Sequence, residues 1–454
     1  MRFRSTLIAA LVALGLGAFL YFYEIEGEKK REEAREKAKK LFLFEEDEVR
    51  KIALVRDDTT HIVVERGKDG LWHIAEPIKT DADQDAVGRL LDTMRDATNE
   101  RVVADSVLDL GKFGLEHPKV RVAIVLKDTT TDTLCIGDFS PTGSYVFARW
   151  AGRPQVFLSK RYVRTRLNQG LFDLRERRVL PFEREEARKL ALKYDGKRFV
   201  LVGGGEEWEL EEPVKLRADN STVRSLLSRL RTERARKFVV EHTTEEDLRT
   251  YGLDRPSVEV TVWLGEERAQ KTLKVGKREG RRYYAKDVSR DPVFMVDSSF
   301  VSYLKKDLMN LRDKHVVRFD RDQVDRIELA YGDSVVACEK DTASGDWYLK
   351  RPKEGKMKTW RANRILSDIK FLQAKEFLGK PEDLKPYGLD SPRIVAKLWH
   401  GEELLAKLSI GGHKDDKVYV LGEEVCLVDS TIVEDLSPSL EELLEEESEA
   451  LSTK

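Results

Sequence analysis

The sequence is poor in residues that bind metal ions or carry out redox chemistry. It has three cysteines and seven histidines among 454 residues, with no Cys-x-x-Cys pair and no His-Glu-x-x-His run. Zinc–thiolate clusters, redox dithiols and zinc-protease sites are therefore not expected. Cys135, Cys338 and Cys426 lie in apolar, strand-like runs, which predicts buried thiols with a packing role.

Loops that bind phosphate or present a catalytic serine are also missing. No Gly-Lys pair is followed by Ser or Thr, and there is no Gly-x-Ser-x-Gly elbow. The 81 basic residues nearly balance 83 acidic ones, so the formal net charge is -2 and no excess positive charge favours nucleic acid. We predict no catalytic residue, no cofactor, no metal site and no nucleic-acid partner.

One long apolar run is present, at residues 7–23, and it contains no charged residue. Its length is at the lower limit for crossing a bilayer, and the aromatic cluster 21–23 is typical of a membrane interface. No clear signal-peptidase site follows, so we expect an uncleaved anchor at 1–23 instead of the alternative, a cleaved signal peptide. Basic residues after the run would alone favour the reverse orientation. The long domain that follows favours a single-pass inner-membrane protein with its bulk in the periplasm.

Residues 24–43 carry many charges and almost no apolar face. Glutamates stand three or four residues before lysines or arginines, in the order that stabilises an isolated helix. This pattern predicts a solvated helical stalk, with a partner-binding helix as the alternative.

Anchor motifs recur in one order along the rest of the chain, which predicts three copies of one unit. An aromatic residue opens each copy, followed by a Trp-x4-Pro motif, an aromatic-Gly-Leu-x-x-Pro motif, a short strand ending in Gly, and a second apolar strand. The motif residues are Phe44, Phe182 and Phe319; Trp72, Trp208 and Trp347; Gly114, Gly252 and Gly388; and Pro118, Pro256 and Pro392. We predict repeat 1 at 44–181, repeat 2 at 182–318, repeat 3 at 319–440 and an acidic tail at 441–454.

A Leu-x-x-Leu-Arg junction closes the first two copies at Arg175 and Arg312. The third copy runs instead into an acidic segment, so we expect its junction to be missing. The repeated tryptophans occupy one equivalent position, which favours packing over the alternative of carbohydrate stacking.

Within each copy, short alternating apolar runs predict an antiparallel meander, and apolar residues spaced by three and four then predict a helix. Asp83, Asn220 and Asn363 lie near the helix starts, where capping residues are favoured. In repeat 2 a capping box of Thr243 with Glu246 is expected to open a short helix before Gly252. The predicted fold is α+β, with one helix covering one face of each antiparallel sheet.

These motifs together, behind an N-terminal anchor, resemble the bacterial family called domain of unknown function 4340, over roughly residues 44–440. The resemblance carries no catalytic residues. It implies an envelope-associated protein and suggests an accessory subunit of an ABC exporter of the gliding-motility type. Phe113 stands where the family usually has tyrosine.

Positive charge is concentrated in residues 213–240. A solvated helix face explains it, and contact with an anionic partner is the sharper hypothesis. The residues in question are Arg224, Arg229, Arg231, Arg234, Arg236 and Lys237.

Three similar units without a shared polar constellation favour repeated surface contacts over one active site. We therefore expect a non-enzymatic, membrane-anchored envelope protein whose tandem domains form a partner-binding arm for a protein partner. A ligand-binding module for an envelope polysaccharide or peptide is the alternative, and an enzyme is a further one.

Overall fold

The computed structural model describes residues 31–445 except 107, 108, 128–130, 206, 267 and 268, and also Gly15, Gly17, Tyr21 and Lys29. Residues 31–39 form a helix within the predicted stalk. The predicted anchor at 1–23 falls outside the described residues apart from Gly15, Gly17 and Tyr21. Among the residues that are described, no helix combines the length and apolar character needed to cross a membrane.

Three antiparallel sheets of nine strands each form the described part of the chain, together with helices, so the fold is α+β. By its contacts the chain divides into two compact units, Met1–Arg178 and Val179–Lys454. The first unit holds the first sheet and the second unit holds the other two. The repeat boundaries predicted from the sequence remain predictions.

The first sheet has the strand order β4-β3-β2-β1-β6-β7-β8-β9-β5. Its strands are β1 (Val49–Arg56), β2 (Thr60–Arg66), β3 (Trp72–Glu76), β4 (Thr80–Asp81), β5 (Arg101–Ala104), β6 (Val120–Leu126), β7 (Thr131–Phe139), β8 (Tyr145–Trp150) and β9 (Val156–Lys160). Its helices are η1 (Glu46–Glu48), α2 (Gln84–Asp96), η2 (Gly111–Phe113), α3 (Arg161–Leu167) and α4 (Leu171–Leu174).

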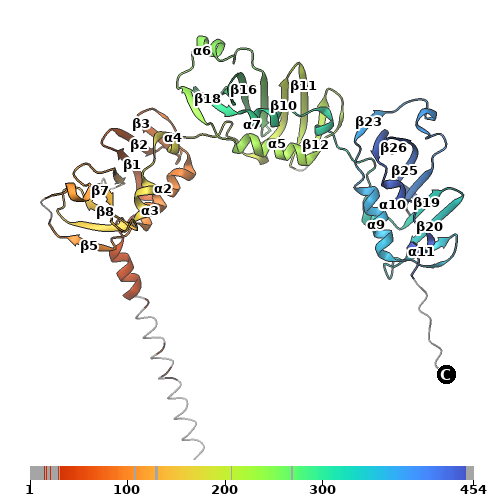
Figure 1. Cartoon of the computed structure of the whole chain (residues 1–454), viewed down its shortest axis with the longest axis horizontal. Coiled ribbons are helices and arrows are strands. Elements are labelled where there is room, and N and C mark those ends of the chain that lie inside the picture. Colours follow the sequence, from red (N-terminus) through yellow and green to blue (C-terminus); the bar gives the residue numbers. More distant parts are fainter. Residues whose placement is uncertain are drawn as a thin grey trace, which may run out of the picture. The chain divides into compact units, whose positions relative to one another are not determined.

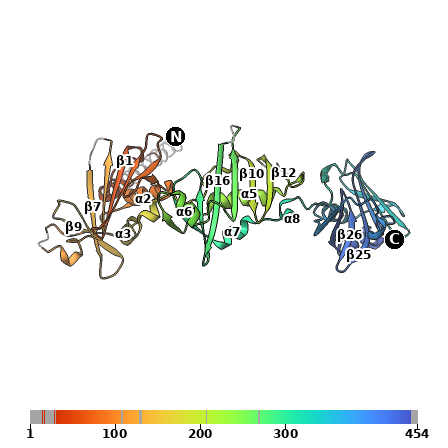
Figure 2. The ribbon, with the colours of Figure 1, turned by 90° about the horizontal axis from the view of Figure 1, so that it is seen from above.

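The second sheet repeats this order as β13-β12-β11-β10-β15-β16-β17-β18-β14. Its strands are β10 (Ala187–Tyr194), β11 (Lys197–Gly204), β12 (Glu207–Glu212), β13 (Leu216–Arg217), β14 (Lys237–Val240), β15 (Val258–Leu264), β16 (Ala269–Glu279), β17 (Arg282–Asp287) and β18 (Val293–Asp297). Its helices are η3 (Arg184–Glu186), α5 (Asn220–Thr232), α6 (Glu245–Thr250), α7 (Ser298–Leu304) and α8 (Leu308–Leu311). Figure 2 shows β16, β10 and β12 within this one sheet, with α5 against it.

The third sheet has the same order again, β22-β21-β20-β19-β24-β25-β26-β27-β23. Its strands are β19 (Arg326–Tyr331), β20 (Ser334–Lys340), β21 (Trp347–Arg351), β22 (Gly355–Lys356), β23 (Glu376–Gly379), β24 (Ile394–His400), β25 (Glu403–Lys414), β26 (Lys417–Leu421) and β27 (Val425–Asp429). Its helices are η4 (Arg321–Gln323), α9 (Thr359–Lys370), η5 (Lys385–Tyr387), α10 (Ile432–Asp435) and α11 (Leu440–Leu443).

Each core lies between one face of a sheet and its long helix, α2, α5 or α9 (Figure 1). In repeat 2 the buried helix residues Val223, Leu226, Leu227 and Leu230 have the predicted helical spacing. They pack against alternating strand residues such as Leu190 and Leu192, which are fully buried. Period-2 strands and one amphipathic helix therefore build the same two-layer core three times.

The predicted helix caps are confirmed at only one of three positions. Asp83 caps α2 by accepting a hydrogen bond from the Ala86 amide at 3.1 Å. The predictions for Asn220 and Asn363 are wrong: Asp219 caps α5, Lys358 occupies the N-cap of α9, and Asn363 lies inside α9. Helices α5 and α9 start earlier than predicted, at Asn220 and Thr359.

The predicted capping box of α6 is wrong by one residue. Thr244, not Thr243, caps the helix, and its partner is Asp247 instead of Glu246. The Thr244 hydroxyl accepts from the Asp247 amide at 3.2 Å, and the Asp247 carboxylate accepts from the Thr244 amide at 2.9 Å. Two successive threonines and three successive acids made both registers possible in the sequence.

The third junction is present, so the prediction that it is missing is wrong. Helix α11 corresponds to α4 and α8, and Leu444 forms a β-bridge with Met357 as Arg175 does with Ala82 and Arg312 with Ala218. Leu443 is fully buried. The leucine spacing is retained while the final arginine is replaced by leucine, and the surrounding acids concealed the motif.

The segment before repeat 1 is also part of its fold. Lys40 forms a β-bridge with Thr98, and Phe42 is buried in the first core. The same bridge recurs before repeat 3, between His315 and Gln373. The end of the predicted stalk therefore packs with the domain instead of standing in solvent.

Candidate functional site

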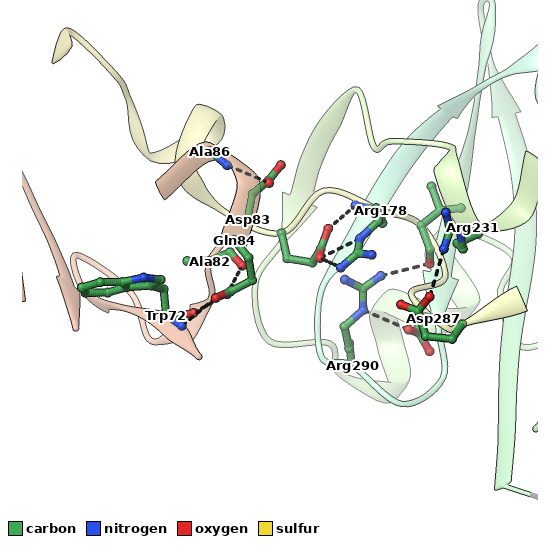
Figure 3. A network of polar contacts seen from close by, with 12 residues as sticks. Trp72, Ala82, Asp83, Gln84, Ala86, Arg178, Arg231, Asp287 and Arg290 are labelled. Atoms are coloured by element: carbon green, nitrogen blue, oxygen red, sulfur yellow. Dashed lines mark hydrogen bonds and ion pairs between the residues drawn. The ribbon is translucent and has the colours of Figure 1, made fainter. Parts of the chain in front are cut away.

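The repeated tryptophans are buried at equivalent positions, with at most 4% of each side chain exposed. The Trp72 amide donates to the Gln84 side chain at 2.8 Å, and the Trp208 amide donates to Asn220 at 2.9 Å (Figure 3 shows the first pair). Asn220 thus ties the strand to the helix instead of capping it. The proline of each Trp-x4-Pro motif follows a cis peptide bond.

The aromatic-Gly-Leu motif turns the chain sharply in every repeat. Gly114, Gly252 and Gly388 have φ of 64°, 69° and 65°, in the left-handed region that glycine adopts at little cost. The proline that completes each motif follows in the loop, where Pro118 is buried and Pro256 and Pro392 are half-buried.

The glycine that ends the short strand is held against this turn. A Cβ atom at Gly137, Gly276 or Gly411 would lie 2.2, 2.1 or 2.3 Å from the carbonyl oxygen of the motif's aromatic residue. Only glycine fits where two backbones come so close. Two motifs that are separate in the sequence therefore form one contact in each repeat.

The motif aromatics pair with a second ring that the sequence did not single out. The ring centroids are 4.9 Å apart for Phe113 and Phe147, 4.5 Å for Tyr251 and Tyr284, and 5.1 Å for Tyr387 and Tyr419. The second ring is the third residue of β8, β17 or β26. An aromatic at that position in all three strands was the available signal.

The opening aromatics lie at the edges of the three cores. Phe182 is 6% exposed, and Phe44 and Phe319 are half-buried against their clusters. These aromatic residues contribute to the three cores by packing.

Several cations of the basic stretch in repeat 2 form ion pairs within the repeat. Arg229 contacts Glu233 at 2.8 Å, and Arg236 contacts Asp297 at 2.7 Å and Glu233 at 3.7 Å. Only 2% of the Glu233 side chain is exposed, and burial raises the pKa of this carboxyl. The two arginines therefore shield a buried carboxylate.

The remaining cations of that set are dispersed. Arg231 contacts Glu183 at 3.0 Å, and Arg224 and Arg234 also have interactions of their own. Lys237 lies on the edge strand β14. Arg224 lines a groove of about 560 Å³ with Arg184 and the α5 serines 221, 225 and 228. The anionic-partner hypothesis for this face remains a prediction.

Repeat 1 contains an aromatic-lined pocket of about 630 Å³. Its walls come from the edge strand β5, the aromatic-Gly-Leu turn and the β7–β8 hairpin. The lining includes Arg101, Val103, Phe113, Tyr145, Phe147 and Leu158. Its lining includes Phe113, the residue that departs from the tyrosine of the other repeats.

The equivalent position in repeat 2 is polar. Arg282 and Glu279 stand where repeat 1 has Tyr145 and Ser140, and the Tyr284 hydroxyl donates to Glu279 at 2.7 Å. This hydrogen bond to Glu279 raises the pKa of Tyr284 to about 12. The aromatic pair is retained while the surrounding pocket is replaced by charged side chains.

An ion pair beside the pocket has opposite polarity in repeat 1. Glu100 of repeat 1 pairs with Lys160 at 3.7 Å, whereas Arg236 of repeat 2 pairs with Asp297 at 2.7 Å. Repeat 3 follows repeat 2, with Lys375 and Asp429 at 3.0 Å. The contact is conserved in position but not in the sign of its charges.

Other reactive groups offer little chemistry. Burial raises the pKa of all three cysteine thiols, to about 12 for Cys338 and Cys426, so they stay protonated at neutral pH. Among the described residues no group of three or more histidines, cysteines or carboxylates is placed to hold a metal ion.

The model of the family "Domain of unknown function (DUF4340)" matches the chain twice in tandem, over residues 72–209 and 208–392. Together the two matches span well over half of the chain. The chain belongs to this family. Each DUF4340 match starts at or beside a repeated tryptophan and runs past the junction into the next repeat. No curated protein and no solved structure matches the chain.

Proposed function

We propose that the chain is a non-enzymatic, membrane-anchored binding arm of the bacterial envelope, with its repeats presenting surfaces to a protein partner. The anchor is the apolar run 7–23, and the repeats lie in the periplasm. The family resemblance suggests that the partner belongs to an ABC-type transport system.

One observation carries this proposal: the residues shared by all three repeats contact one another inside each repeat. The clearest case is the glycine that ends the short strand. A Cβ atom added to it would lie 2.1 Å to 2.3 Å from the carbonyl oxygen of the motif aromatic. The recurring residues thus serve the fold, while beside them the surface residues Tyr145 and Ser140 of repeat 1 are replaced by Arg282 and Glu279 in repeat 2. Repeats with a common fold and different surfaces are suited to binding different parts of a partner.

The aromatic-lined pocket of repeat 1 favours a second candidate, a ligand-binding module for an envelope polysaccharide or peptide. Its volume of about 630 Å³ lies within the range of sites for small ligands. Phe113 and Phe147 offer flat apolar surfaces to such a ligand. The two candidates are compatible if the ligand is part of the partner.

Affinity purification of the full-length chain from detergent-solubilised membranes tests the proposal. We expect a membrane transport component to copurify in near-stoichiometric amounts after crosslinking in cells. The control is residues 1–39 joined to an unrelated soluble domain, which retains the anchor and stalk but lacks the repeats. Recovery of the same proteins with the control, or of the chain alone, would contradict the proposal.

Orientation needs a separate test. Protease added to intact spheroplasts should degrade the repeats, because the proposal places them outside the inner membrane. Protection of the repeats until the membrane is lysed would put them in the cytoplasm.

A further inference from the structure

Strand β5 forms an open edge of the first sheet. It pairs with β9 on one side and is the last strand in the sheet order. Val102 and Val103 are 41% and 38% exposed, which is unusual for valines in a strand of four residues. Edge strands with exposed apolar residues accept a further strand readily. The opposite edge, β4, has only two residues and offers a poor template.

The aromatic-lined pocket opens beside this edge. Arg101 and Val103 of β5 line it together with Phe113 and Phe147. The register of β5 on β9 shifts between Val102 and Ala104, and such a bulge can re-aim a side chain. An incoming strand on β5 would therefore pass directly over the pocket.

The lip of the pocket is already ordered by its own hydrogen bonds. The Ser140 amide donates to the Tyr145 carbonyl at 2.9 Å, and the Tyr145 amide donates to the Ser140 hydroxyl at 3.3 Å. The Gly143 amide donates to the Ser140 carbonyl at 2.8 Å. A preformed lip lowers the entropic cost of binding an apolar side chain.

One positive charge on the rim is uncompensated. Arg101 is exposed, and its side chain has no hydrogen-bond or ion-pair partner in the described part of the chain. The neighbouring acid Glu100 is already engaged, by Lys160 at 3.7 Å and by the Thr98 hydroxyl at 2.6 Å. The rim therefore favours a ligand that brings a carboxylate to Arg101.

We propose that repeat 1 binds an extended peptide segment of a partner by strand addition to β5, with an apolar side chain in the aromatic-lined pocket and a carboxylate on Arg101. The inference rests on the proposed function, because it specifies how the binding arm contacts its partner. Side chains two apart in a strand face the same side. Arg101 and Val103 both line the pocket, so the peptide carries its apolar and acidic residues two positions apart.

The test uses the full-length chain in detergent and a fluorescent seven-residue peptide, acetyl-Thr-Thr-Leu-Thr-Glu-Thr-Thr-amide. We expect binding tighter than about 0.1 mM by fluorescence anisotropy, as for a short ladder with one buried side chain. Replacing the central Thr by Pro, or Leu by Ala, should weaken binding about tenfold or more, because the first removes a ladder donor and the second empties the pocket.

Charge reversal gives the sharper readout. Arg101→Glu should weaken binding of this peptide about tenfold and should favour a peptide with Lys in place of Glu. The control is Lys68→Glu, which reverses an exposed charge in the turn between β2 and β3, away from the pocket lining, and should leave binding unchanged. Circular dichroism of both variants checks that the fold is retained.

Absence of binding at about 1 mM peptide, or equal binding by wild type and Arg101→Glu, would overturn the inference. Binding of an oligosaccharide or a fatty acid in the pocket, with no binding of peptide, would overturn it too. If Arg101→Glu still captures the membrane partner, the inference fails and the proposed function stands. If the wild-type chain captures no partner, the proposed function itself fails.

Discussion

Repeats 1 and 2 share one backbone frame and differ in the surface that surrounds it. Both place a glycine against the carbonyl of a motif aromatic, and in both that aromatic ring packs against the ring of the third residue of β8 or β17. Beside this shared frame, repeat 1 has an apolar pocket and repeat 2 has Arg282 and Glu279. Even the adjoining ion pair is reversed in sign. The close contact between the strand-end glycine and the aromatic carbonyl leaves no room for a side chain. The ion pair can reverse its charges, because it requires only that the two residues have opposite sign.

The largest effect should come from the shared glycine contact. Gly276→Ala puts a Cβ atom 2.1 Å from the Tyr251 carbonyl oxygen, so we expect a loss of about 3 kcal/mol in the stability of repeat 2. Gly137→Ala and Gly411→Ala should cost similar amounts in their own repeats. Hydrogen exchange measured by mass spectrometry reports each repeat separately.

The control for these substitutions is Gly88→Ala inside α2, where an added Cβ meets nothing within 4 Å. It should stabilise repeat 1 by about 0.5–1 kcal/mol. If one of the three strand-end glycines accepted alanine without loss, the repeats would not share the frame described above.

Shortening the chain tests whether α11 stabilises repeat 3 as the third junction helix. Removal of everything after residue 440 deletes the end of α11, including the fully buried Leu443, and should cost about 2–4 kcal/mol in repeat 3. Removal of everything after residue 445 should change its stability by less than about 0.5 kcal/mol. Equal stability of the two shortened chains in urea would show that α11 is dispensable.

Asp313 offers a smaller effect with a characteristic pH dependence. Burial pushes its pKa up, but hydrogen bonds from the His315 ring and amide and from Arg318 hold the pKa below the ordinary value of 3.8. A lowered pKa means that ionised Asp313 stabilises the fold above that value, and that the contribution is lost as the pH falls through the folded-state pKa.

Asp313→Asn should therefore cost about 1–2 kcal/mol at pH 7. The difference from wild type should begin to shrink as the pH falls below the ordinary aspartate value of 3.8, and it should be lost as the pH passes through the lower folded-state pKa. Urea unfolding from pH 7 down to about pH 2 measures this. In the first junction, Glu176 occupies the position equivalent to Asp313, and its carboxylate accepts a hydrogen bond from the Arg178 side chain at 2.8 Å. A difference that persisted unchanged at low pH would point to lost packing instead of lost charge.

The smallest effect is expected at the reversed ion pair. Glu100→Arg should cost less than about 1 kcal/mol, because Lys160 is 55% exposed and surface pairs contribute little. Adding Lys160→Asp should restore that loss by giving repeat 1 the polarity of repeat 2. A double-mutant cycle in chemical denaturation measures the coupling. A coupling energy near zero would mean that the ion pair between Glu100 and Lys160 does not contribute to the stability of repeat 1.

Much of the fold can be predicted from the sequence, because motifs that are weak singly recur in the same order in three copies. The long helices and the left-handed glycines were predictable from spacing and from local stereochemistry alone. The short edge strands β5, β14 and β23 were not, since four residues have no detectable period and their pairing with β9, β18 and β27 is non-local. Helix α11 was hidden by acids on its exposed side.

The aromatic-lined pocket was beyond sequence reasoning for a different reason. Its residues come from β5, from the turn at Phe113 and from the β7–β8 hairpin, which are joined only by tertiary packing. The deviation of Phe113 from tyrosine was visible, but its meaning depends on Tyr145 and Phe147. Two ion pairs of the basic stretch in repeat 2, Arg236 with Asp297 and Arg231 with Glu183, were equally non-local, whereas the pairs with Glu233 are only three or four residues apart.

The bridges that Lys40 and His315 make at the start of their repeats have a consequence for how such chains change over time. Each sheet takes all nine of its strands from one continuous stretch of chain. Excision of residues 179–315 would bring Val316 directly after Arg178 and deprive no remaining sheet of a strand. Chains with this arrangement can gain or lose whole repeats. Their lengths should therefore differ by multiples of the length of one repeat.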